Sequence, residues 1–172
     1  MILLEEKYLY TIFETPYGNV GIVKTLKGLY MVLLPQKTTE DVKRKLKLRL
    51  AGRLIKDDFF CKGIKKKLID YFSRKFVRFN EAIDFSGASD FDKRVWSAAS
   101  KIPKGEVRSY GWVAKSIGNE KAKRAVGRAL SRNRLPIVIP CHRVIQKDGD
   151  IGGFSSGVPM KRLLLKIEGR VL

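Results

Sequence analysis

The feature that most constrains the fold is a change in hydrophobic spacing near residue 39. Before it, residues 8–34 hold short runs of strand-forming residues separated by two glycine-containing turn sequences. This pattern predicts three short antiparallel strands. After it, apolar residues recur at helical spacing, which predicts helices over residues 39–54 and 63–76. The first half should therefore fold as a three-stranded antiparallel sheet with helices.

A small polar segment, Ser86-Gly87-Ala88-Ser89, marks the expected boundary between two domains, residues 1–86 and 87–172. Beyond it, helical spacing predicts three further helices, over residues 90–101, 109–116 and 121–132. The last two are short and joined by a glycine-containing turn, which is typical of a helix-turn-helix. We therefore expect an α/β (α+β) protein, whose N-terminal α/β domain precedes a mostly helical, winged-helix-like domain containing that motif.

The net charge favours a polyanionic partner. The chain has 36 Lys and Arg against 17 Asp and Glu, a formal net charge of +19. A thermophile's charged surface is the alternative, but there Lys and Glu rise together, and here the acidic residues do not rise with the basic ones. An excess of this size favours nucleic acid, although charge does not separate DNA from RNA. We interpret the basic faces of the helices at 39–54 and 63–76 as solvated surface.

Hydropathy and cysteine usage indicate the compartment. No apolar run approaches the roughly 18 residues of a membrane span. The start, MILLEEKYLY, resembles neither a secretory signal nor a transit peptide. Cys61 and Cys141 lie in different contexts and form no disulfide framework, and His142 is the only histidine. We expect a cytoplasmic protein without a metal or a cofactor.

The predicted helix at 121–132 carries basic residues on one side. Arg124, Arg128 and Arg132 are spaced by four residues and share a face, while the small residues Ala125 and Gly127 allow a close approach to a neighbour. Such a helix is suited to lie along phosphates. The alternative is an ordinary surface helix packed on a core, which the mid-helix glycine mildly disfavours.

Residues 135–145, LPIVIPCHRVI, contain the candidate reactive centre. The β-branched residues 137–139 predict a buried segment, and Pro140 then sets the approach to Cys141. His142 and Arg143 follow directly, and adjacent basic groups lower the pKa of a thiol and make it a nucleophile. A lone cysteine is more often structural, which is our interpretation of Cys61.

At these residues a family resemblance appears. Pro140-Cys141-His142-Arg143, after the apolar segment, resembles the acceptor motif of the O6-alkylguanine-DNA alkyltransferases, also called methylated-DNA–protein-cysteine methyltransferases. The similarity runs from about Phe91 to Gly169. It includes KGEVRSYGWVAKSIG and RAVGRALSRN, which resemble the helix-turn-helix, and IGGFSSGVPMKRLLLKIEG, which resembles the binding loop and closing helix. The first half resembles the family only in size and in its strand-then-helix pattern.

The resemblance implies direct-reversal DNA repair, in which an alkyl group passes irreversibly from O6-alkylguanine to the protein, once per molecule. Cys141 would accept the group, His142 would remove the thiol proton through a water, and Glu168 would orient that histidine. Asn133 would bond near the active-site turn and hold the two halves of the site together. Tyr110 would donate a proton to the departing base. The resemblance leaves open whether O4-alkylthymine is also a substrate.

The resemblance also implies how a monomer would engage double-stranded DNA. The damaged nucleotide lies inside a duplex and must be rotated out, and Arg124 would fill the gap. Backbone groups of Cys141 and Val144, together with Ser155, would hold the guanine. The implied DNA-binding residues are Arg124, Arg128, Tyr110, Ala125 and Gly127.

The sequence departs from the family pattern in its binding loop and its first half, and two alternative functions remain. Phe154 and Ser156 replace the tyrosine and glycine that family members often carry in the binding loop, and Ser156 is expected to narrow the pocket. The zinc ligands of some members are absent from the first half. One alternative is a lesion-recognition module without chemistry, a class that lacks the acceptor cysteine. The other is a cysteine hydrolase, which leaves the basic helix unexplained.

Overall fold

The computed structural model describes residues 6–171 of the chain and divides it into two compact units, Met1–Asp84 and Phe85–Leu172. Residues 1–5 and residue 172 lie outside the described residues. Residues 1–5 form the first half of the segment MILLEEKYLY, on which the prediction about leader sequences rests. Each unit is described by itself. Among the described residues, no helix combines the length and the apolar character that a membrane span requires.

The first unit is built on a mixed sheet with the strand order β3-β2-β1-β4. The three predicted strands are present and antiparallel, and a fourth strand pairs in parallel with β1. The strands are β1 (Lys7–Thr15), β2 (Gly18–Thr25), β3 (Gly28–Gln36) and β4 (Arg53–Lys56).

Strand β4 corrects the helix predicted over residues 39–54. Helix α1 (Thr39–Arg49) ends where Leu50 turns extended, with φ −123° and ψ 115°. The chain then approaches β1 so closely at Gly52 that a Cβ there would clash with Glu6 and Tyr8. Leu54, placed on the helical face by its spacing, instead pairs with Tyr8 in the parallel ladder. The tertiary pairing outweighs the local helical pattern.

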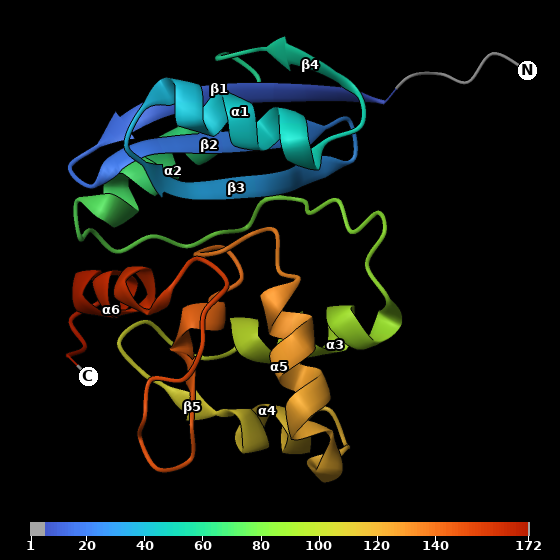
Figure 1. Cartoon of the computed structure of the whole chain (residues 1–172), viewed down its shortest axis with the longest axis vertical. Helices are drawn as coiled ribbons and strands as arrows, with labels where there is room; N and C mark the ends of the chain where they lie inside the picture. Colours follow the sequence, from blue (N-terminus) through green and yellow to red (C-terminus); the bar gives the residue numbers. More distant parts are fainter. Residues whose placement is uncertain (1–5, 172) are drawn as a thin grey trace, which may run out of the picture. The chain divides into compact units, whose positions relative to one another are not determined.

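Two helices accompany this sheet (Figure 1). Thr38 caps α1 by accepting a hydrogen bond from the Asp41 amide (3.1 Å), and the buried Val42 and Leu46 pack against the sheet. Helix α2 (Lys62–Phe72) contacts β1 and ends four residues earlier than predicted. Most lysines and arginines of both helices are exposed, and the apolar residues on the opposite faces are buried.

The second unit is mostly helical, as predicted. Helices α3, α4 and α5 contact one another (Figure 1). The indole of Trp96, in α3, donates to the carbonyl of Ala129, in α5 (2.9 Å). Ser89 and Ser109 cap α3 and α4 through their side chains. The elements are α3 (Asp90–Ser100), β5 (Arg108–Ser109), α4 (Tyr110–Ser116), η1 (Glu120–Ala122), α5 (Lys123–Ser131), η2 (Cys141–Arg143), β6 (Val144–Ile145) and α6 (Val158–Ile167).

The segment before Cys141 is mostly buried, as predicted, but its conformation is unusual. Ile137 and Ile139 are buried as expected, but they form no strand, and Ile137 has a positive φ of 75°. A β-branched residue rarely adopts this conformation, so the surrounding packing must hold it. The overall class, an N-terminal sheet with helices followed by a helical unit, agrees with the sequence analysis. The helix-turn-helix and winged-helix description stays a prediction.

Candidate functional site

A two-residue parallel ladder brings the predicted site residues together. Strand β5 pairs with β6 through Arg108 with Val144 and Ser109 with Ile145. Tyr110 follows β5 directly, and Cys141 lies in the short turn η2 that leads into β6. Residues about thirty positions apart in the chain are therefore held side by side.

Cys141 is 6% exposed and opens on a cavity of about 340 Å³. A tight turn at Pro140, in which the Cys141 amide donates to the carbonyl of Ile139 (2.8 Å), sets its position. The thiol therefore borders a space that a small ligand group can enter. The lining residues are Tyr110, Gly127, Leu130, Ser131, Cys141, Gly153, Phe154 and Ser155.

Asn133 joins this turn to the end of α5. Its side-chain amide donates to the carbonyl of Ile139 (2.9 Å) and to Sγ of Cys141 (3.1 Å), and its carbonyl accepts from the Leu135 amide (2.9 Å). Every polar atom of this buried side chain is bonded. Asn133 thus orients the thiol from the side of the basic helix.

Behind the thiol lies a buried histidine–carboxylate pair. Nε2 of His142 is 2.8 Å from Oε1 of Glu168, and neither side chain is exposed. Burial lowers the pKa of His142, and the bond to Glu168 offsets this only in part. Because the ionised carboxylate can only accept, Nε2 carries the proton. Nδ1 is then the basic nitrogen, and it has no hydrogen-bond partner among the described residues.

Arg143 completes the support of this pair. Its guanidinium donates to Oε2 and Oε1 of Glu168 (both 2.8 Å) and to the carbonyl of Ile102 (2.6 Å). Burial alone would raise the pKa of Glu168, but the hydrogen bonds from His142 and Arg143 outweigh it and hold that pKa well below its ordinary value. From the sequence, Arg143 is predicted only to be a cation next to the thiol. In the structure it secures the charge of Glu168.

Both Cys141 and Tyr110 are protonated in the resting site. Burial raises the pKa of Cys141, partly offset by the bond from Asn133 and by the charge of Lys161. The resting group is therefore a thiol, which must lose its proton before it can attack. Burial, and then the charge of Cys141, raise the pKa of Tyr110, so its phenol keeps a proton to donate.

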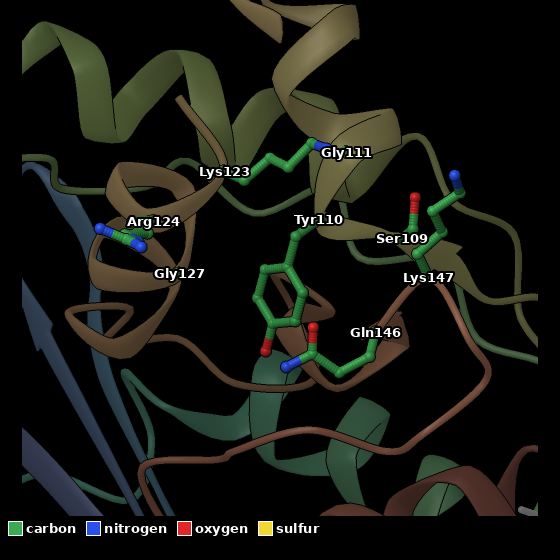
Figure 2. A pocket seen from close by; sticks show the side chains of 8 residues that line it. All are labelled: Ser109, Tyr110, Gly111, Lys123, Arg124, Gly127, Gln146 and Lys147. Atoms are coloured by element: carbon green, nitrogen blue, oxygen red, sulfur yellow. The ribbon is translucent and has the colours of Figure 1, made fainter. Parts of the chain in front are cut away.

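A second cavity, of about 290 Å³, lies on another side of Tyr110. Figure 2 shows the Tyr110 ring in its centre, with Arg124 and Lys123 to one side and Ser109 and Lys147 to the other. Tyr110 and Gly127 also line the cavity at Cys141. The remaining lining residues are Gly111 and Gln146. Basic side chains thus line a second opening, which shares Tyr110 and Gly127 with the cavity at the thiol.

The three arginines that were predicted to share one face of the helix differ in their contacts. Arg124 and Arg128 are exposed, and Arg124 borders the second cavity. Arg132, which spacing placed on the same face, caps α5 and pairs with the buried Asp92 (2.5 Å). Arg132 is thus held by an ion pair, although its side chain stays 52% exposed. Ala125 and Gly127 are half-buried between Arg124 and Arg128.

The residues predicted to hold the guanine lie in two places. Val144 is fully buried just after the thiol-bearing turn, and Ser155 is exposed at the rim of the cavity. Phe154 also lines that cavity, whereas Ser156 is exposed next to it in the chain.

The other cysteine, Cys61, is fully buried in the other unit, and burial raises its pKa to about 11.

Comparison with known proteins decides the family. Residues 8–85 match the family described as 6-O-methylguanine DNA methyltransferase, ribonuclease-like domain, and residues 90–170 match the DNA binding domain of the same description. The chain belongs to the O6-methylguanine-DNA methyltransferase family. This confirms the resemblance and extends it to the first half.

Individual members of the O6-methylguanine-DNA methyltransferase family align over most of their length. A methylated-DNA–protein-cysteine methyltransferase of Methanosarcina acetivorans is 38% identical over 93% of this chain and 97% of its own. An inducible one of Bacillus subtilis is 36% identical over 88% and 85%. The crystal structure of Mycobacterium tuberculosis OGT in complex with DNA has a TM-score of 0.77 and 33% identity, covering 93% of this chain and 92% of that one.

Two side chains of this region were not predicted from the sequence. Gln146 lines the second cavity, and Lys161 is fully buried in α6. The signal for Lys161 was present, because helical spacing places it on one face with Leu164 and Leu165. No local signal marks Gln146, because it follows β6 in a loop whose path depends on tertiary contacts.

Proposed function

We propose that this chain repairs DNA by transferring the alkyl group of O6-alkylguanine in duplex DNA to Cys141, once per molecule. The observation that carries the proposal is the thiol at the cavity, supported by Asn133 and by the buried pair of His142 and Glu168. The relatives named methylated-DNA–protein-cysteine methyltransferases support the same reaction. We also propose a cytoplasmic location, since both cysteines are free.

The proposed chemistry balances as a displacement at the alkyl carbon. The thiol proton of Cys141 passes through a water to Nδ1 of His142, and Glu168 stabilises the resulting imidazolium. Sulfur then forms a bond to the carbon as the bond from that carbon to O6 breaks. Tyr110 donates a proton to the departing guanine; burial raises its pKa, so the phenol is protonated before the reaction begins. The thioether product has no activated leaving group, so one molecule acts once.

The proposed DNA contacts centre on α5. The target must leave the base stack to reach a thiol that is 6% exposed. Arg124 would occupy the vacated position, with Arg128 on phosphates and the half-buried Ala125 and Gly127 permitting close approach. Backbone groups of Cys141 and Val144, together with Ser155, would hold the extruded guanine.

Incubation with a duplex containing O6-methylguanine tests the proposal directly. We expect one methyl group per protein molecule, located on the peptide that contains Cys141, at any excess of DNA. Mass spectrometry of the intact protein and of its peptides gives the count and the position. A lesion-binding module would retain the duplex and gain no mass. Repair of more than one guanine per molecule would contradict the single-turnover mechanism.

Arg124→Ala should slow the repair of duplex DNA more than the reaction with free O6-benzylguanine. Extrusion costs a few kcal/mol of unstacking, which Arg124 is proposed to offset, whereas the free base needs no extrusion. We expect a loss of roughly tenfold or more on the duplex and little loss on the free base. Single-turnover rates on both substrates measure the difference.

Arg49→Ala is the matched control for Arg124. It removes the same charge from an exposed position on α1, in the other unit. Its effect should be small on both substrates. If Arg124→Ala slows both substrates equally, Arg124 serves the chemistry or the fold instead of the extruded state.

A further inference from the structure

Lys161 is a buried cation that the proposed transfer does not use. Its side chain is fully buried in α6, on the same face as Leu164 and Leu165. Lysine is almost never fully buried, because removing an ammonium group from water is costly unless its donors are bonded. The burial of this ammonium group therefore requires a structural explanation.

All three donors of the ammonium group are directed at backbone carbonyls. Nζ donates to Val144 and Ile151 (both 2.6 Å) and to Gly153 (3.4 Å). An ammonium group has three N–H donors, so the set is complete. Because the acceptors belong to the main chain, these bonds define the path of the backbone and not the position of one side chain.

The three carbonyls come from the two sides of the proposed base-binding site. Val144 directly follows the turn that carries Cys141. Ile151 and Gly153 flank Gly152, whose φ is 67° and where a Cβ would lie 3.4 Å from the phenol oxygen of Tyr110. Gly153 also lines the cavity at the thiol. Lys161 thus connects the nucleophile's segment with the loop that closes the cavity.

Other hydrogen bonds of this loop are local. The Gln146 amide donates to the carbonyl of Asp150 (2.9 Å), and the Gly157 amide donates to the carbonyl of Phe154 (2.9 Å). Such bonds shape the loop internally without attaching it to the rest of the unit. The bonds of Lys161 attach it to α6 and to β6.

We infer that Lys161 is a positioning residue, whose ammonium group holds the loop of residues 151–155 against the segment that follows Cys141 and so maintains the cavity for the alkylated guanine. This inference rests on the proposed function. It concerns the capture of the base and not the acidity of the thiol. The competing role is electrostatic, because the charge of Lys161 also lowers the pKa of Cys141.

Lys161→Met, which keeps an unbranched side chain one atom shorter and removes the donors, tests the inference. We expect O6-benzylguanine to half-saturate the reaction at a concentration roughly tenfold higher or more, because a bonded charged group is lost. Hydrogen exchange of residues 151–155 should accelerate by a similar factor. The pH profile for alkylation of Cys141 by iodoacetamide should move only slightly to higher pH, because the charge of Lys161 is one of several causes that lower the pKa of Cys141. Lys166→Met, at an exposed position of the same helix, is the matched control.

The outcomes separate the possible roles of Lys161. A midpoint shifted far to higher pH, with unchanged loop exchange, would show that Lys161 activates the thiol and would overturn the inference. Unchanged half-saturation would overturn it as well. If the methionine variant lacks a cooperative thermal transition, Lys161→Gln, which keeps an N–H donor on a shorter side chain, takes its place with the same expectations. Failure of the unaltered protein to react with methylated duplex would contradict the proposed function instead, and the loop exchange would still report on Lys161.

Discussion

Cys141→Ala should abolish alkyl transfer and leave binding to duplex DNA largely intact. The thiol is the only group at the cavity that is placed for displacement with a histidine next to it, among the residues the structure describes. Alanine removes the sulfur, and the proposed phosphate contacts lie on α5. Peptide mass spectrometry after incubation with methylated duplex measures the transfer, and fluorescence anisotropy at fixed salt measures the binding.

Cys61→Ala provides the control for the cysteine chemistry. Cys61 is also free and buried, but it lies in the other unit, and burial raises its pKa to about 11. This variant should transfer one methyl group at the rate of the unaltered protein. Methyl groups found on Cys61, or residual transfer in Cys141→Ala, would show that the acceptor has been assigned to the wrong cysteine.

Glu168→Gln should impair both stability and transfer. The carboxylate is fully buried and accepts hydrogen bonds from His142 and twice from Arg143. Removing one partner of a buried ion pair costs roughly 3–5 kcal/mol of unfolding free energy, because the remaining charge stays buried. Loss of the oriented histidine should slow transfer by roughly 10²–10⁴-fold, the usual contribution of a general base. Urea unfolding and single-turnover kinetics measure the two effects.

The pH dependence of stability tests the same carboxylate. Its pKa is held below the ordinary 4.5, and the pKa of His142 lies below 6.5. Unfolded chains therefore take up protons first as the pH falls, so the free energy of unfolding should fall below pH 6.5 and more steeply below pH 4.5. In Glu168→Gln the second, steeper loss should be smaller, because the group no longer titrates.

Glu40→Gln, at an exposed position of α1, is the control for the loss of a carboxylate. It should change the unfolding free energy little, since exposed ion pairs contribute about 0–1 kcal/mol. An acid-side loss in Glu168→Gln equal to that of the unaltered protein would mean that other carboxylates determine the acid sensitivity.

Local patterns in the sequence determined the elements of this protein well. Alternation and glycine turns located β1, β2 and β3, because strand geometry repeats every two residues whatever the strand pairs with. The helices expected from residues 90 and 109 begin within one residue of those positions, where Ser89 and Ser109 accept hydrogen bonds from amides in the first turn. The adjacency of Cys141 and His142 pointed to a nucleophile, and the resemblance then supplied the roles of the more distant residues.

The tertiary structure decided what depends on distant partners. Helical spacing assigned Leu54 to a helix, yet pairing with β1 makes it part of a strand. The same spacing grouped Arg132 with the other arginines, until Asp92, forty positions away, paired with it. The sequence does not distinguish Lys161 from the many other basic residues, because its hydrogen bonds go to the carbonyls of Val144 and Ile151, which the fold brings to it. Periodicity identifies the face on which a residue lies, but its partner is set by contacts that close long loops.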